Sequence, residues 1–253
     1  MGVHIVVVAI LLGFAGNGML AQPQRDQARG RAMPWYKLGL DDLKAEQWEK
    51  AATEFQHALV IDPTFEMAYY ALGRAMMPQR KYGEAVGALA KCRDLYTQQA
   101  GRLFANQQDA QQYRRDRITE IDDLIRQYQQ GPQTPQKLEA VRQLEDNRRR
   151  IQDNIQRGTN VSLDVSVPSF VSLALGSAYF RLGRLADAER EYKATIAADP
   201  KTGEAHSNLA VVYLQTGRYD EAEKAVKAAE KTGFKVNPML KEDIAAGRKA
   251  GKS

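Results

Sequence analysis

The sequence predicts an all-α protein in which about four helix-turn-helix repeats are interrupted by a long antiparallel coiled-coil hairpin. Two observations carry this prediction. Similar stretches recur at an offset of 34 residues, with Trp35 matching Tyr69 and Leu175 matching Leu209. Between the second and third stretches, two segments with helical spacing of apolar residues flank the helix breaker GPQTP at 131–135.

The composition excludes several classes of protein. The 253 residues include 36 basic and 31 acidic side chains, and this net charge of +5 is too nearly balanced for a dedicated nucleic-acid binder. A single cysteine can form neither an intramolecular disulfide nor a cysteine-rich zinc module. The sequence has no Gly-rich phosphate loop, GxSxG, HExxH or CxxC motif. We therefore expect no enzymatic activity, no cofactor and no bound metal.

The N-terminal segment differs from the rest of the chain. Residues 3–15 are an apolar stretch, with His4 near its start, that would span about 20 Å as a helix, which is less than the roughly 30 Å of a bilayer's hydrocarbon core. The length is typical of a signal-peptide core, and cleavage is expected after Ala21, so that residues 1–21 are removed. This predicts an exported protein, periplasmic or secreted. The alternative is an inner-membrane anchor formed by residues 3–21.

The recurring stretches share residue types at fixed positions. Each has Leu followed by Gly or Ala where a first helix would cross a second, and two of them end in Asp-Pro, which stops a helix. The pairs are Leu38-Gly39, Leu72-Gly73, Leu175-Gly176 and Leu209-Ala210, and the terminating prolines are Pro63 and Pro200. The pattern resembles the tetratricopeptide repeat (TPR) family. The resemblance implies a superhelix of stacked antiparallel helix pairs, each of which buries its neighbour's face.

This resemblance divides the chain into segments. Repeats 1 and 2 are expected at 32–99, repeats 3 and 4 at 169–236, and a capping helix with a tail at 237–253. Cys92 falls at a position where the family has a small residue between crossing helices, so we interpret it as a core residue. His206 falls at the first pattern position of the fourth repeat, where the family has a large residue, so we interpret it as a packing residue.

Residues 100–168 contain no repeat and are predicted to form the hairpin arm plus a loop. Because no breaker separates them from the second repeat, one helix is expected from Glu84 to Gln130, about 70 Å long, which would project from the repeats. The apolar stripes on which the hairpin prediction depends are Ile118, Ile121, Ile125 and Tyr128 before the turn, and Leu138, Val141, Leu144, Ile151 and Ile155 after it.

Arginine clusters occur on both predicted hairpin helices. A turn centred near residue 133 would place the two clusters opposite each other along the hairpin. They have two interpretations, namely a basic patch for an anionic partner and a solvated helix surface in which arginines pair with nearby carboxylates. The many neighbouring acidic residues favour the second. The six residues are Arg114, Arg115, Arg117, Arg148, Arg149 and Arg150.

The TPR resemblance also implies a binding surface, because in that family the first helix of each repeat lines a concave groove. The family's carboxylate clamp is disfavoured, since Tyr36 and Leu173 stand where it needs lysine. An apolar groove with aromatic anchors fits a peptide or helix instead. The predicted groove residues are Tyr36, Leu40, Lys44, Tyr70, Arg74, Met77, Phe170, Leu173, Phe180, Arg181, Val211 and Gln215.

The function that follows is that of a non-catalytic adaptor or scaffold for protein-protein interaction. One alternative is a structural oligomer that self-associates through the arm, and another is an accessory subunit of an envelope enzyme complex. Nucleic acid is not an expected partner, and membrane contact is expected only if the N-terminal segment is uncleaved.

Overall fold

The computed structural model describes residues 22–99, 107–130, 132, 134–157 and 167–250. Over these residues the chain forms α-helices and no strand, which confirms the predicted all-α class. The predicted signal peptide, residues 1–21, lies outside the described residues. The helices are α1 (Gln22–Lys44), α2 (Trp48–Ile61), α3 (Glu66–Met76), α4 (Tyr82–Gln99), α5 (Gln107–Gln129), α6 (Pro135–Arg157), α7 (Ser169–Arg181), α8 (Leu185–Ala198), α9 (Gly203–Gln215), α10 (Tyr219–Lys231) and α11 (Pro238–Ala250).

Eight of these helices form four consecutive pairs, α1 with α2, α3 with α4, α7 with α8, and α9 with α10. Bare backbone is needed where the helices of a pair cross. A Cβ atom on Gly73 would lie 2.5 Å from the Leu89 side chain, and one on Gly176 would lie 2.7 Å from the Tyr192 ring. The small residues of the repeat pattern therefore set the close approach of the paired helices.

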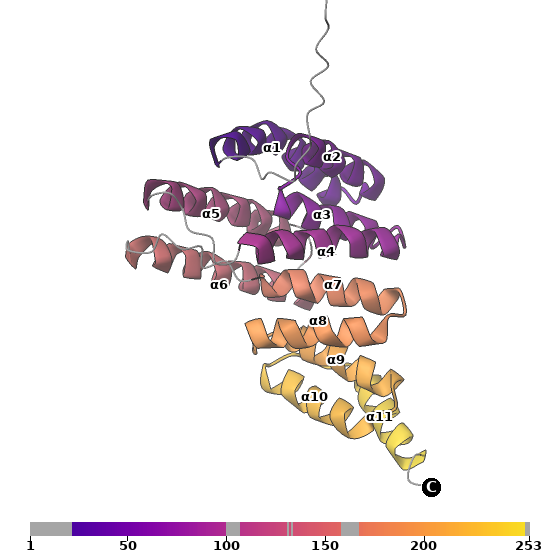
Figure 1. Ribbon diagram of the computed structural model, residues 1–253. Coiled ribbons are helices and arrows are strands. Elements are labelled where there is room, and N and C mark those ends of the chain that lie inside the picture. The colour runs from indigo at the N-terminus through magenta and orange to yellow at the C-terminus, as the bar shows by residue number, and fades with distance from the viewer. Residues whose placement is uncertain (1–21, 100–106, 131, 133, 158–166, 251–253) are drawn as a thin grey trace, which may run out of the picture.

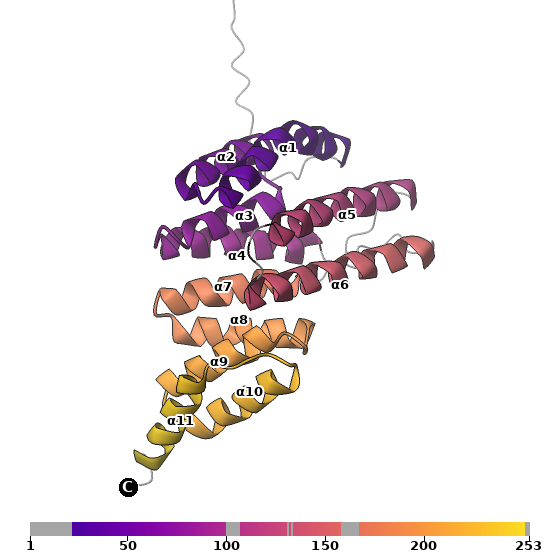
Figure 2. The same ribbon diagram turned by 180° about the vertical axis from the view of Figure 1, so that it is seen from behind.

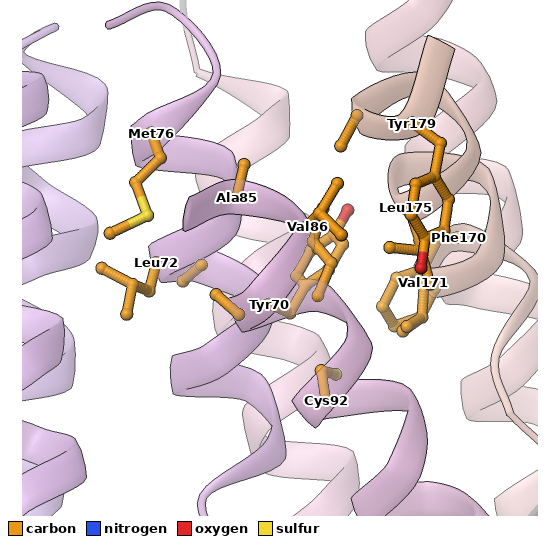
Figure 3. Packing of buried hydrophobic residues seen from close by; sticks show 14 of the residues in the cluster. Tyr70, Leu72, Met76, Ala85, Val86, Cys92, Phe170, Val171, Leu175 and Tyr179 are labelled. Carbon is orange, nitrogen blue, oxygen red and sulfur yellow. The ribbon is translucent and has the colours of Figure 1, made fainter. Parts of the chain in front are cut away.

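The four pairs form one continuous stack, although the hairpin segment separates the second pair from the third in sequence (Figure 1). Helix α7 packs directly against α4, and Phe170 and Val171 point toward Tyr70 and Cys92 (Figure 3). The Phe170 and Tyr70 rings meet edge to face with centroids 4.9 Å apart. Cys92 is fully buried, and this burial raises the pKa of its thiol, so that it stays protonated.

Helices α5 and α6 lie side by side on one face of this stack (Figure 2). Their pairing is antiparallel, and the Arg148 guanidinium of α6 donates to the Asp122 carboxylate of α5 at 2.8 Å. The two helices are therefore paired side by side, and the coiled-coil hairpin stays a prediction.

The expectation of one long helix from Glu84 to Gln130 is wrong. Helix α4 ends at Gln99, and α5 begins at Gln107 as a separate helix that returns to the repeats. The physical reason is the apolar stripe of α5, because Ile121 and Leu124 are completely buried within the chain's core cluster. A helix that continued away from the repeats would leave these side chains in water.

Helix α11 covers the end of the stack by packing on α10 and α9. Its first turn is capped by the Asn237 side-chain oxygen, which accepts a hydrogen bond from the Met239 amide at 3.0 Å. Leu240 and Ile244 are buried against the last repeat. None of the helices in the described ranges combines the length and the apolar character needed to cross a bilayer.

Candidate protein-binding face

Helices α1, α3, α7 and α9 are the first helices of the four pairs, and the two sets of predicted groove residues on them that follow are together termed the groove face. Its N-terminal half comprises Tyr36, Leu40, Tyr70 and Arg74. Its C-terminal half comprises Leu173, Phe180, Arg181, Val211 and Gln215. These two sets hold nine of the twelve residues that the repeat pattern assigned to a groove.

The other three assigned residues lie in different surroundings. Phe170 is buried against Tyr70 at the junction of the second and third pairs. Met77 is half-buried against the core cluster. Lys44 is exposed, and it lines a cavity of about 240 Å³ between α1 and α5, together with Lys37 and Gln127.

Helix α5 covers the N-terminal half of the groove face. The Tyr128 ring lies under the Arg74 guanidinium, with 4.4 Å from the guanidinium carbon to the ring centroid. The Tyr128 and Tyr70 hydroxyl oxygens are 3.4 Å apart, and the Gln127 side-chain amide donates to the Leu40 carbonyl oxygen at 2.9 Å. Tyr36 has no exposed surface, and its ring packs against Phe55 and Phe65 with centroids 5.8 and 4.7 Å apart.

An ionic network also stabilises the contact between α5 and the repeats. Arg29 of α1 donates to the carboxylates of Asp62 at 2.6 Å, Glu66 at 2.8 Å and Glu120 at 2.7 Å. Burial alone would lower the pKa of Arg29, but the attraction of Glu66, Glu120 and Asp62 raises it well above its usual value. Arg29 therefore stays charged and joins α5 to the first two repeats.

Sequence reasoning missed this network because it placed the start of the first repeat at residue 32. Helix α1 begins ten residues earlier, at Gln22. The signal was present in the spacing, since the buried residues Ala28, Ala32, Tyr36 and Leu40 follow one another at intervals of four.

Several buried polar atoms in this contact lack a hydrogen-bond partner among the described residues. On the repeats they are the Tyr36 hydroxyl and Nη1 of Arg74, and on α5 they are Nη2 of Arg117, Oδ2 of Asp123 and Oε1 of Gln127. Burial and the nearby Glu120 carboxylate raise the pKa of Tyr36, so its hydroxyl is a neutral donor. The contact between α5 and the groove face is thus buried but incompletely hydrogen-bonded.

The C-terminal half of the groove face has a different character. Leu173, Phe180 and Val211 are half-buried, while Arg181 and Gln215 are exposed. Helix α6 packs against α7, and next to the start of α9 the Gln143 amide donates to the Thr202 hydroxyl at 3.1 Å. This half therefore combines half-buried apolar side chains with one exposed cation.

The arginines of the hairpin are not gathered on one surface. Arg114 and Arg117 are buried, at 7% and 6% exposure, and Arg117 pairs with Glu120. Arg148 pairs with Asp122, and Arg149 lies 3.8 Å from Asp146. The remaining two, Arg115 and Arg150, are exposed.

The described residues include no group of three or more His, Cys, Asp or Glu side chains placed to hold a metal ion. His206 is half-buried, and its Nε2 lies 3.1 Å from the Pro200 carbonyl oxygen. Over the same residues, the chemistry of the groove face is that of apolar, aromatic and cationic side chains, which suits binding.

Comparison with known proteins agrees with this architecture. Residues 173–233 match the family model described as tetratricopeptide repeat. No curated protein matches the chain by sequence.

Solved structures similar to this chain include PilW, a widely conserved type IV pilus biogenesis factor, with 14% identity, 87% coverage of both chains and a TM-score of 0.41. PilF of Pseudomonas aeruginosa has 18% identity, 88% and 89% coverage and a TM-score of 0.33. A thermophilic TPR protein of Thermus thermophilus has 20% identity, 85% and 98% coverage and a TM-score of 0.33. The repeated helix pairs and the family match together identify this chain as a protein that contains tetratricopeptide repeats.

Proposed function

We propose that the chain is a non-catalytic scaffold that binds a peptide or helix of a partner protein on its groove face. The observation that carries this proposal is the position of α5, a helix of the chain itself that lies across Tyr36, Leu40, Tyr70 and Arg74. A face that holds one amphipathic helix has the shape and the side chains to hold another.

The C-terminal half of the groove face is where a partner makes its first contact in this proposal. Phe180 and Val211 supply an aromatic and an aliphatic surface, and Arg181 adds a charge at the rim. Buried aromatic and arginine side chains contribute most to protein-protein binding free energy, which supports the choice of this half. Export of the protein remains part of the proposal and rests on the apolar residues 3–15.

The test is affinity capture from the native host with the full chain and with a triple variant, Phe180→Ala, Arg181→Ala and Val211→Ala. We expect the triple variant to capture at least tenfold less of the partner than the native chain does, while its helical circular dichroism is unchanged. The matched control replaces one aliphatic, one arginine and one large apolar residue at exposed sites elsewhere, Val60→Ala, Arg149→Ala and Met239→Ala. Equal capture by the triple variant and the control would refute the proposal.

Self-association through the hairpin receives less support. Ile121 and Leu124, which an intermolecular helix contact would need, are already buried within the same chain. Light scattering addresses the point directly, because the proposal expects a monomer in the absence of the partner.

A further inference from the structure

We infer that α5 is a replaceable occupant of the N-terminal half of the groove face, and that the helix which replaces it is an acidic amphipathic helix of a protein partner. This inference rests on the proposed function, because it names the ligand class and the control of the same face. It is carried by the chemistry of the α5 contact, by the unpartnered atoms within it and by the independence of the repeat stack from α5.

Helix α5 meets the repeats through Arg117, which lies 4.8 Å from the Tyr96 ring centroid, and through three residues that define a ligand pattern. Glu120, Leu124 and Tyr128 are spaced by four residues, so they lie on one face of the helix. Glu120 accepts from Arg29 at 2.7 Å, Leu124 is completely buried, and Tyr128 stacks under Arg74. An acidic, an aliphatic and an aromatic residue at this spacing are therefore what this half of the face recognises.

The charge of the face favours an acidic ligand. Arg74 lies beside Tyr128, and the cavity between α1 and α5 is lined on the α1 side by Lys37 and Lys44 with a single carboxylate, Asp41. Arg29 holds Glu120 although it already binds Asp62 and Glu66. An incoming helix with more carboxylates at these points would be attracted to the same cations.

The bound α5 leaves donors of the face unused. The Tyr36 hydroxyl and Nη1 of Arg74 are buried, and within the described chain neither has a hydrogen-bond partner. Asp123 of α5 is close enough to raise the pKa of Tyr36, yet its own Oδ2 is also without a described partner. A partner helix whose carboxylate reached Tyr36 or Arg74 would form bonds that α5 does not form, and it would bind the face more tightly.

The repeat stack also has contacts of its own that do not involve α5. Helix α4 packs directly on α7, and Arg93 of α4 donates to Glu191 of α8 at 2.7 Å, so the second and third pairs hold together without α5. Replacement of α5 therefore requires no separation of the repeats.

The experiment measures binding of a fluorescent synthetic peptide with the sequence of residues 107–130 to the full chain by anisotropy. The double variant Glu120→Ala and Tyr128→Ala weakens only the chain's own α5, whereas the peptide keeps both residues. We expect this variant to bind the peptide at least tenfold more tightly than the native chain does. The control variant Arg149→Ala and Arg150→Ala changes exposed residues of α6 and should bind like the native chain.

Three outcomes would overturn the inference. Equal peptide affinity of the native chain and the folded double variant would show that α5 does not compete for the face. Unchanged binding when Arg74→Ala is added to the double variant would show that the peptide binds elsewhere. If a peptide with Glu120→Gln, Asp122→Asn and Asp123→Asn bound as tightly as the native peptide, the face would not require an acidic ligand.

Two further measurements keep the test decisive. If the double variant loses helical circular dichroism, Tyr128→Phe alone replaces it, since it removes only the hydroxyl contact with Tyr70, and a smaller shift in the same direction is expected. If light scattering showed that the native chain is a dimer, a second copy of the chain would be the ligand of the groove face. That result would overturn the inference that the ligand is a helix of a different protein. The triple variant of the C-terminal half does not alter α5, so failure of the peptide assay and failure of the proposed function are observed separately.

Discussion

The four helix pairs and the α5–α6 hairpin bury helices of the same chain in different ways. Within a pair the backbones approach closely because Gly73 and Gly176 leave room for Leu89 and Tyr192. Helix α5 instead meets the groove face through long side chains, such as Arg29 and Tyr128, and leaves several polar atoms unpartnered among the described residues. The crossings within the helix pairs, which recur along the chain, depend on residue size. The contact between α5 and the groove face occurs once, depends on charge and aromatic stacking, and leaves more of the described polar atoms without a hydrogen bond.

The largest effect is expected at Arg29, where the two regions meet. Arg29→Met would leave Asp62, Glu66 and Glu120 buried without their shared cation, so we expect the free energy of unfolding to fall by about 3–5 kcal/mol. Urea denaturation measures this loss. Arg31→Met, at an exposed position of the same helix, should change the value by less than about 0.5 kcal/mol. A loss below about 1 kcal/mol at Arg29 would show that the network does not join the regions.

A pair of leucine variants compares the regions directly. Leu89 of α4 and Leu124 of α5 are both completely buried. Leu89→Ala should lower the global free energy of unfolding by about 3 kcal/mol, because the repeats unfold together. Leu124→Ala should lower it by about 1 kcal/mol or less and should mainly reduce hydrogen-exchange protection in α5 and α6. If the two variants lower global stability equally, the hairpin belongs to the same cooperative unit as the repeats.

The crossing of α3 and α4 should tolerate little added volume. Gly73→Val would place atoms against Leu89 and 3.3 Å from the Ala85 carbonyl oxygen, so we expect a loss of about 2 kcal/mol in thermal or urea unfolding. Gly87 of α4 is the matched control, because a Cβ there meets no atom within 4 Å. Gly87→Ala should stabilise the helix by about 0.5–1 kcal/mol. Equal effects at both glycines would contradict the role assigned to the crossing.

The smallest effect concerns the contact between the third and fourth pairs. The Arg218 guanidinium hydrogen-bonds to Glu189 and lowers the pKa of that carboxyl from 4.5 to about 2. The folded pKa lies below the unfolded one, so the stabilisation is complete above pH 4.5 and disappears as the pH falls toward 2. Glu189→Gln should cost about 0.5–1 kcal/mol at pH 7 and nothing near pH 2, as measured by urea denaturation. A cost that does not depend on pH would exclude this origin.

The repeats could be predicted from the sequence because each crossing recurs with the same residue sizes. The start of α1 and the position of α5 could not. Arg29 and Glu120 are far apart in sequence, and nothing in their local spacing indicates that they meet. The turn between α5 and α6 was predictable, but the surface on which the hairpin rests depends on contacts that occur once in the chain.

The groove residues illustrate the same limit. The repeat positions placed Tyr36, Tyr70 and Arg74 on the first helices, where the structure has them. Their burial under α5 required the tertiary contact with Tyr128 and Gln127, which no periodic pattern encodes.

The direct contact between α4 and α7 can form only after the segment that contains α5 and α6 has been synthesised. About 69 residues separate the end of α4 from the start of α7. At about 5–20 residues per second, α7 is synthesised roughly 3–14 s after α4. During that interval the side of α4 that carries Val86 has no neighbouring pair, whereas α5 and α6 already follow it from the tunnel (Figure 3). Helix α5 can therefore bind the N-terminal half of the groove face before repeats 3 and 4 have been synthesised.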